Sequence, residues 1–148
     1  MTSHDILLVE DDLDCVLLTR RALRKCDIAN DLAVVHDGVA ALDYLFATGT
    51  YVGRDRREMP RLVLLDLDLP KLDGFEVLRR LRANEQTKLL PVVVLTSSKE
   101  ESDLLRAHSL GANSYIRKSV DSTEFNEAIR LLGRYWLQLN LPAPRKGS

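Results

Sequence analysis

The chain has 148 residues, which is enough for one domain with a buried core and too few for several. Its 21 basic and 22 acidic residues give a net charge of -1, so there is no electrostatic reason to expect a nucleic-acid or membrane-surface partner. Residues 1–5 lack the basic and apolar regions of a signal peptide, and no apolar run reaches the roughly 18–20 residues of a membrane span, so we expect a cytoplasmic protein.

Five short apolar runs predict strands along the chain. They cover residues 5–9, 31–36, 62–65, 91–95 and 114–117. The third run is apolar at every position, which is the pattern of a parallel strand buried on both faces. It ends directly at Asp66, so a carboxylate is expected at a strand end, where open α/β sheets bind their ligands.

The segments between these runs have the spacing of amphipathic helices. The predicted helices cover about 13–25, 40–48, 75–83, 99–110 and 121–139. In the first helix Val16, Leu17 and Leu23 are expected to face inward, and Gly111 is expected to cap the fourth helix. Strands that alternate with helices predict an α/β fold, with a parallel sheet covered by helices on both faces.

Two segments fall outside this alternation. Residues 50–60 are polar and rich in arginine, and they exceed the usual connection of about 2–6 residues. This stretch is either a mobile surface loop or a contact for a specific partner. Residues 140–148 are expected to form a disordered tail. On the last helix, Leu131 and Tyr135 lie off the inner stripe and are either a dimer contact or singly exposed side chains.

Polar residues follow the predicted strands at one edge of the sheet. Glu10 and Asp11 follow the first strand, Asp66 the third, Thr96 the fourth and Lys118 the fifth. The carboxyl ends of parallel strands share an edge, so these side chains should converge. Three carboxylates attract a hard divalent cation, for which Mg²⁺ is suited. The lysine and the threonine could hold phosphoryl oxygens, so the group fits in-line phosphoryl transfer to Asp66.

Four motifs at these strand ends resemble the receiver domain of two-component response regulators. They are ILLVEDD (6–12), LLDLDLPKLDG (64–74), VLTSS (94–98) and SYIRKS (114–119). The resemblance covers residues 4–139 and implies a flavodoxin-like (βα)5 fold with strand order 2-1-3-4-5. It implies one receiver domain and no output domain.

The resemblance also implies roles for individual residues. Asp66 would be the phospho-acceptor. Mg²⁺ would be bound by Asp66, by the carboxylates of Glu10 and Asp11, and by the main-chain carbonyl of Asp68. These are the residues of LLVEDD and LLDLD that match the family's motifs.

Three further matches concern the response to phosphorylation. Thr96 matches the switch hydroxyl, Lys118 the lysine that pairs with the phosphoryl group, and Tyr115 the aromatic side chain whose rotamer follows phosphorylation. One position departs from the family, because Ser119 stands where a proline after a cis peptide bond is usual. A non-proline cis bond costs about 2.5–4 kcal/mol, so the peptide bond after Lys118 is expected to be either trans or held under strain.

The implied function is that of a stand-alone response regulator and not of an enzyme with turnover. A sensor histidine kinase would donate the phosphoryl group, and output would use protein–protein contacts or relay to a phosphotransfer protein. The long arginine-rich loop resembles that of the small regulators paired with bacterial phytochromes. A homodimer through the face of helix 99–110, strand 114–117 and helix 121–139 is also expected.

Two other functions fit part of the pattern. Asp66 and Asp68 form the DxD pattern of haloacid-dehalogenase-like phosphatases, in which the first aspartate is the nucleophile and the second the acid/base. That family carries the pattern on its first strand, whereas here it follows the third. A receiver-like binding module that is never phosphorylated is the other alternative, and the five converging polar residues speak against it.

Overall fold

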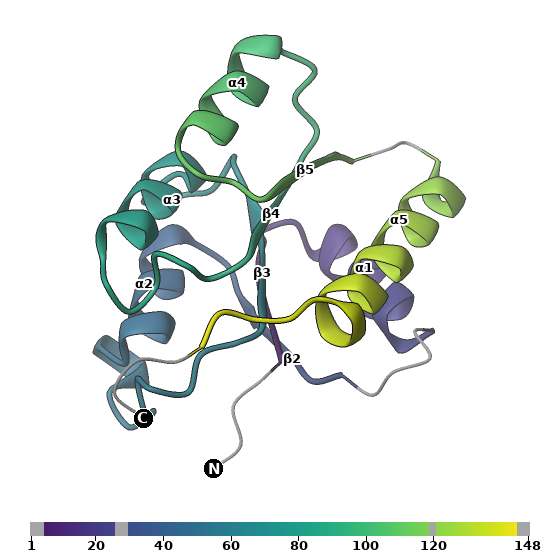
Figure 1. The fold of residues 1–148 in the computed structure, drawn as a ribbon. Helices are drawn as coiled ribbons and strands as arrows, with labels where there is room; N and C mark the ends of the chain where they lie inside the picture. The colour runs from purple at the N-terminus through teal and green to yellow at the C-terminus, as the bar shows by residue number, and fades with distance from the viewer. Residues whose placement is uncertain (1–4, 26–29, 119–120, 145–148) are drawn as a thin grey trace.

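The computed structural model describes residues 5–25, 30–118 and 121–144. Its centre is a parallel sheet of five strands in the order β2-β1-β3-β4-β5. Figure 1 shows this sheet between two layers of helices. The strands are β1 (Ile6–Val9), β2 (Leu32–Val35), β3 (Leu62–Asp66), β4 (Val92–Thr96) and β5 (Ser114–Arg117). The predicted flavodoxin-like fold and its strand order are confirmed.

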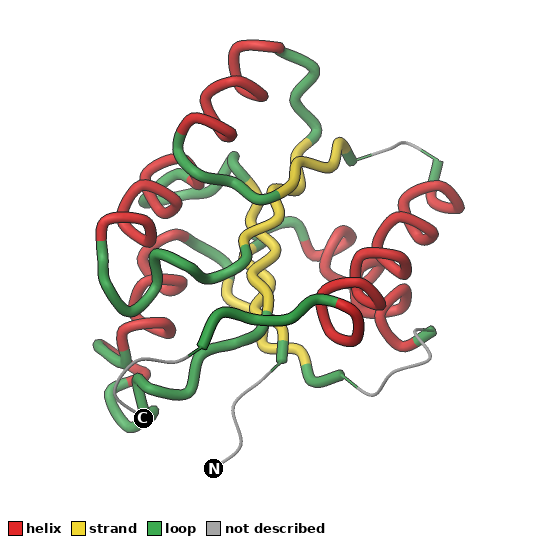
Figure 2. The backbone as a smooth tube through the Cα atoms, viewed as in Figure 1, coloured by secondary structure: helices red, strands yellow, loops and turns green. Residues whose placement is uncertain are grey.

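Five α-helices cover the two faces of the sheet (Figures 1 and 2). They are α1 (Leu13–Arg24), α2 (Gly38–Phe46), α3 (Gly74–Ala83), α4 (Glu101–Ser109) and α5 (Ser122–Arg134). Helices α1 and α5 pack on one face, and α2, α3 and α4 lie on the other. No helix in the described part of the chain is long and apolar enough to cross a membrane.

Alternating side chains of the strands feed two cores. On β1, Ile6 and Leu8 join the core beneath α1 and α5, whereas Leu7 and Val9 join the core beneath α2 and α3. Period-two alternation places successive side chains on opposite faces, and both faces here are covered, so every residue of β1 is buried. This explains why β1 is apolar without interruption, as are β3 up to Leu65 and β4 up to Leu95.

Helix α1 corrects one prediction about its inner face. Val16 and Leu23 are buried as expected, but the Leu17 side chain is 53% exposed. Cys15 and Thr19 occupy the inner stripe instead, with the thiol 3.9 Å from the Thr19 hydroxyl oxygen. Successive helical residues differ by about 100° around the axis, so Leu17 is turned outward once Cys15 and Val16 face the sheet.

Aspartates start most of the helices directly after the strand ends. The N-cap side chains of Asp12, Asp37, Asp73 and Asp121 each accept a hydrogen bond from a backbone N–H of the first helical turn. At the other end of α4, Gly111 has a φ of +102°, the left-handed conformation expected of a C-terminal glycine. The aspartate caps lie at the carboxyl edge of the sheet, whereas the Gly111 cap lies at the opposite edge, before β5.

The arginine-rich segment 50–60 contacts α2, and the C-terminal segment continues from α5 across the edge of the sheet. Gly49–Tyr51 forms a 3-10 turn (η1), and the Arg54 guanidinium lies 4.0 Å above the Tyr44 ring and donates to the Tyr44 carbonyl. Helix α5 continues as a π-helical turn, η2 (Tyr135–Leu139), after which the chain crosses toward the α2 and α3 side (Figure 1). Residues 145–148 of the predicted tail lie outside the described residues.

Candidate functional site

The neighbouring strands β1 and β3 bring three carboxylates together at the carboxyl edge of the sheet. Val9 pairs with Leu65, so the residues that follow them are level with each other. Carboxylate oxygens of Glu10, Asp11 and Asp66 all lie within 4.8 Å of one another. Glu10 and Asp66 are buried and Asp11 is exposed, so the group has a buried floor and an open side.

The Lys118 ammonium enters this group from the end of β5. Its Nζ lies 2.6 Å from Oε1 of Glu10 and 3.6 Å from Oδ1 of Asp66. The backbone N–H of Lys118 donates to the Thr96 carbonyl over 2.6 Å, which ties the end of β5 to β4. The lysine therefore converges with Asp66 as predicted, but its shorter ion pair is with Glu10. The Lys118–Ser119 peptide lies outside the described residues.

The charges in this group are unbalanced. Burial raises the pKa of Asp66 to about 7, the nearby Glu10 carboxylate adds to this effect, and Lys118 opposes it. Burial disfavours the charge on Lys118, but Glu10 and Asp66 outweigh burial, and the lysine pKa is raised. One ammonium thus faces more negative charge than it can neutralise.

The residues fit a hard divalent cation. All three acidic side chains offer oxygen ligands, and a bound cation would favour the ionised form of Asp66 against its burial. The buried Cys15 thiol lies close to Glu10, and burial followed by that carboxylate raises its pKa to about 12. Because Cys15 stays protonated, it offers no thiolate, and the donor set contains only hard oxygen atoms.

The loop after β3 lies over the acidic group. The backbone N–H of Asp68 is 3.4 Å from Oδ1 of Asp66, and the Asp68 side chain is exposed. A Cβ on Gly74 would lie 2.3 Å from the Asp66 carbonyl oxygen and 2.6 Å from Cα of Leu67. Only a glycine lets α3 begin this close to the backbone of Asp66.

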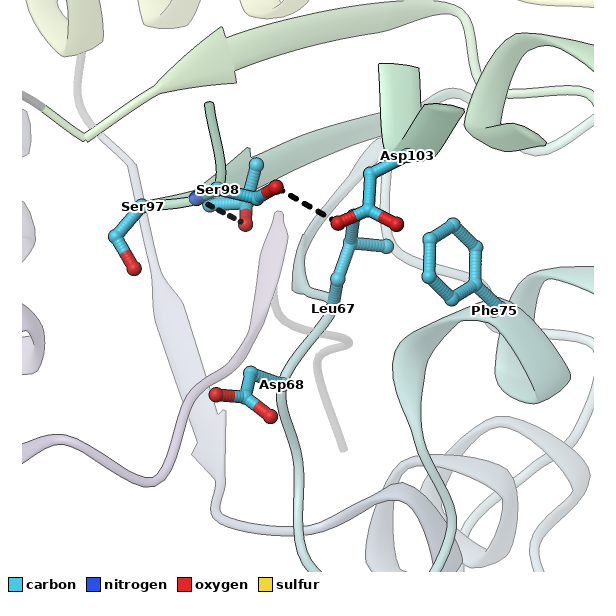
Figure 3. Close-up of a pocket in the computed structure, with 7 residues that line it drawn as sticks. Leu67, Asp68, Phe75, Ser97, Ser98 and Asp103 are labelled. Carbon is cyan, nitrogen blue, oxygen red and sulfur yellow. Dashed lines mark hydrogen bonds between the residues drawn. The ribbon is translucent and has the colours of Figure 1, made fainter. Parts of the chain in front are cut away.

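Thr96 and Tyr115 lie beside a cavity of about 280 Å³ next to this group. Figure 3 shows its lining residues, which are Leu67, Asp68, Phe75, Thr96, Ser97, Ser98 and Asp103. The buried Thr96 hydroxyl oxygen accepts from the backbone N–H of Ser98 over 3.1 Å. The Tyr115 hydroxyl lies near those of Thr96 and Ser98, but within the described residues it makes no hydrogen bond of good geometry.

One contact in the cavity was not predicted from the sequence. The Ser98 hydroxyl donates to Oδ2 of Asp103 over 2.7 Å, which ties the loop after β4 to the first turn of α4 (Figure 3). Ser98 belongs to the motif VLTSS, so a search of strand ends could have found it. Asp103 lies inside a helix and has no such signal.

Comparisons with known protein families and curated sequences agree with this geometry. The family described as "Response regulator receiver domain" matches residues 6–130. Rcp1, a response regulator of Synechocystis sp., is 38% identical over 139 residues, which is 93% of this chain and 92% of Rcp1. FilR2 of Methanothrix harundinacea, a probable methanogenesis regulatory protein, is 41% identical over 135 residues, which is 91% of this chain and 84% of FilR2.

Solved structures give the same result. The phosphorylated cyanobacterial phytochrome response regulator RcpA superposes with a TM-score of 0.87 at 34% identity, covering 96% of this chain and 100% of RcpA. The Mn²⁺-bound form of Rcp1 has a TM-score of 0.87 at 35% identity with the same coverage. The bacteriophytochrome response regulator AtBRR has a TM-score of 0.73 at 46% identity, covering 95% of this chain and 100% of AtBRR.

Proposed function

Because the chain belongs to the response regulator receiver domain family, we propose that Asp66 accepts a phosphoryl group from the phosphohistidine of a sensor histidine kinase. The observation that carries the proposal is the meeting of Asp66 with Glu10, Asp11 and Lys118 at one sheet edge. An Asp66 carboxylate oxygen forms the new P–O bond, the P–N bond of the donor breaks, and the leaving nitrogen keeps the electron pair and takes a proton.

The acidic residues would hold Mg²⁺ through Glu10, Asp11, Asp66 and the main-chain carbonyl of Asp68. The cation supplies positive charge that offsets the carboxylates and the phosphoryl oxygens. The Mn²⁺-bound structure of the relative Rcp1 supports a divalent ion in this family. Lys118 is bound to Glu10 in the unmodified form, so we propose that it turns from Glu10 to a phosphoryl oxygen when Asp66 is modified.

Thr96 and Tyr115 would carry the change to the surface. Thr96 would leave the N–H of Ser98 and donate its hydroxyl to the phosphoryl group, and Tyr115 would repack into the space that this opens. The face of α4, β5 and α5 carries the exposed side chains Leu105, Leu131 and Tyr135. We propose that this face forms the homodimer or contacts the next protein of the pathway, including a phosphotransfer protein.

The proposed kinase is of the bacterial phytochrome type. This rests on the likeness to the phytochrome response regulators RcpA and AtBRR, over nearly the whole of their length. The kinase would take its phosphoryl group from ATP, which would place the reaction in the cytoplasm. Asp66 would itself be modified by the incoming phosphoryl group, and hydrolysis of the aspartyl phosphate would release phosphate. The protein would therefore not turn over a separate substrate. The comparisons give no support to the phosphatase alternative.

The test is transfer of label from a phosphorylated bacteriophytochrome kinase in the presence of Mg²⁺. Wild type is expected to take up label, and Asp66→Asn to take up none. Asp73→Asn is the matched control, because Asn keeps the N-cap of α3 and leaves the acidic group intact. Label on the Asp66→Asn protein would show that another residue is the acceptor.

Dimer formation needs a separate measurement. Leu131 is 54% exposed and Tyr135 49% exposed on successive turns of the helix. Sedimentation of the phosphorylated and unmodified proteins should reveal a dimer that Leu131→Asp weakens. Identical sedimentation of wild type and this variant in both states would rule out the proposed face as the dimer contact.

A further inference from the structure

A second cavity, of about 430 Å³, lies at the opposite edge of the sheet from Asp66. Pro60, Arg61 and Pro91 line it, and they directly precede β3 and β4, whereas Asp66 ends β3. Its walls come from three separate segments, which are residues 56–61, residues 85–91 and residues 142–144. The last of these is the part of the chain that crosses the sheet edge after α5 (Figure 1).

The walls of this cavity are mainly apolar. Met59, Leu89, Leu90 and Ala143 contribute aliphatic surface, and four prolines, at 60, 91, 142 and 144, contribute rings that carry no N–H donor. Leu89 is 64% exposed, so its side chain is open to a partner beside the other apolar groups of the cavity. The volume is in the range of about 300–1,000 Å³ that is typical of ligand sites.

The rim of the cavity is cationic. Arg56, Arg57, Arg61 and Lys88 line it together with a single acidic residue, Glu85. Arg57 is paired with Asp55, and Lys88 is paired with Glu85 over 3.0 Å.

The other two cations are held by uncharged acceptors. The Arg56 side chain donates to the Gln86 amide oxygen over 2.9 Å, and Arg61 donates to the Leu137 carbonyl. A guanidinium bound only to neutral oxygen keeps its full positive charge and can still accept a carboxylate as a partner. Among the residues that the structure describes, no carboxylate pairs with Arg56 or Arg61, so the cavity combines apolar walls with two cations.

We propose that this cavity binds an extended acidic segment of a partner protein. An apolar side chain of that segment would lie on Leu89 and the prolines, and flanking carboxylates would pair with Arg56 and Arg61. A small anion would need cations that converge on one point, whereas these two are fixed to separate parts of the rim, by Gln86 and by Leu137. An extended chain with alternating side chains fits such a spread-out rim.

This binding site goes beyond the proposed phosphoryl transfer. It lies at the other end of β3 from Asp66, so an occupied cavity leaves the acidic group open to a kinase. The partner is then held independently of phosphorylation, and Asp66→Asn must bind it as wild type does. If phosphoryl transfer to Asp66 failed, the acidic segment could still bind to this cavity. If the segment failed to bind, transfer to Asp66 could still occur.

The experiment uses a fluorescent peptide in which glutamates alternate with leucines. Two control peptides carry lysines in place of the glutamates, or serines in place of the leucines. Binding is followed by fluorescence anisotropy, and the contact residues by amide chemical shifts in the full chain. The test variants are Arg56→Glu and Leu89→Asp. Their matched controls are Arg21→Glu and Leu17→Asp, which replace two exposed side chains of α1.

The expected result is that the acidic, leucine-containing peptide binds and shifts the amides of residues 86–90. Arg56→Glu and Leu89→Asp should each weaken binding by about fivefold or more, and both control variants and Asp66→Asn should bind as wild type. Added salt should weaken binding, because rim charges are screened. No binding, equal binding of either control peptide, unchanged binding by Arg56→Glu, or shifts confined to other residues would each overturn the proposal.

Discussion

Buried charge occurs at both edges of the sheet, but its environment differs between them. At the carboxyl edge, Glu10 and Asp66 share one ammonium, that of Lys118, and burial with Glu10 raises the pKa of Asp66 to about 7. At the amino edge, the Arg82 side chain is half-buried, and burial lowers the pKa of its guanidinium. Arg82 is held by neutral oxygen acceptors, whereas the two carboxylates at the other edge repel each other.

Arg82 lies in the last turn of α3 and joins three segments. Its nitrogen atoms donate to five oxygens of two connecting loops. These are the carbonyls of Thr87, Lys88, Leu90 and Gly111 and the side-chain oxygen of Asn113, at 2.8–3.3 Å. A guanidinium held by several carbonyl and amide oxygens stabilises the fold, whereas a cluster of carboxylates with excess negative charge can still bind a cation. The contrast between Arg82 and Asp66 separates a structural role from a functional one.

The largest expected effect is the loss of stability when Arg82 is replaced. Arg82→Met should lower the free energy of unfolding by about 3 kcal/mol, because several carbonyls lose their donor at once. Urea denaturation measures the loss. Arg80→Met is the matched control on the same helix, since Arg80 makes only an exposed pair with Glu76, and it should cost about 0.5 kcal/mol or less. Equal losses in the two variants would contradict the structural role of Arg82.

The second effect concerns the packing of α3 on the acidic edge. Gly74→Ala would place a Cβ 2.3 Å from the Asp66 carbonyl oxygen, so the backbone must shift, at a cost of about 2 kcal/mol. The same shift should weaken Mg²⁺ binding, because it moves the backbone that carries Asp66 and Asp68. Gly53→Ala is the control, since nothing lies within 4 Å of its added Cβ. A Gly74→Ala protein with unchanged stability and unchanged Mg²⁺ affinity would contradict the close contact.

A smaller effect, of opposite sign, is expected for the acidic group itself. The folded pKa of Asp66, about 7, lies above the usual value near 3.8, so protonation stabilises the folded form. That contribution is complete below about pH 4 and is lost as the pH rises through about 7. Asp66→Asn carries no charge, so without metal it should be more stable than wild type by about 1–2 kcal/mol at pH 8, with a smaller difference at pH 5.

Added Mg²⁺ should change the difference in stability between wild type and Asp66→Asn. Mg²⁺ at about ten times its dissociation constant should stabilise wild type by about 1.4 kcal/mol and Asp66→Asn by less, which reverses part of the difference at pH 8. Thermal unfolding with and without Mg²⁺ provides the measurement, with Asp73→Asn as the control whose pH dependence follows wild type. A destabilised Asp66→Asn protein at pH 8 without metal would show that Lys118 outweighs burial and Glu10.

The sequence predicted the fold and the acidic edge because both depend on the backbone alone. Continuous apolar runs mark buried parallel strands, and the ends of such strands must share an edge, so Glu10, Asp11, Asp66 and Lys118 converge whatever the details of packing. The predicted strands differ from the observed ones by one residue at most at each end, and the range of β5 is the same.

The remaining features depend on side-chain geometry that no spacing records. Lys118 pairs more closely with Glu10 than with Asp66, which depends on rotamers and on competition between two carboxylates. Leu17 is exposed because Cys15 and Thr19 fill the inner stripe, and a helical pattern does not distinguish these alternatives. Arg82 has the sequence signature of an ordinary surface charge at a helix end.

The smallest expected effect concerns the Tyr115 hydroxyl at the carboxyl edge, which should contribute little to the free energy of unfolding before phosphorylation. The Tyr115 hydroxyl is buried and has no partner of good geometry within the described residues, so Tyr115→Phe should change the free energy of unfolding of the unmodified protein by about 0.5 kcal/mol or less. Thr96→Val is the comparison, because the Ser98 N–H then loses its acceptor, at a cost of about 1 kcal/mol.

Tyr115→Phe also tests whether the tyrosine hydroxyl takes part in the response to phosphorylation. If the hydroxyl of Tyr115 gains a partner after modification, beryllium fluoride with Mg²⁺ should stabilise wild type more than Tyr115→Phe, although the two unmodified proteins are equally stable. Equal stabilisation would leave the tyrosine as a packing residue only. A loss of more than about 1 kcal/mol in unmodified Tyr115→Phe would show that the hydroxyl is already bonded at rest. Unsatisfied groups would then no longer distinguish the carboxyl edge from the edge that holds Arg82.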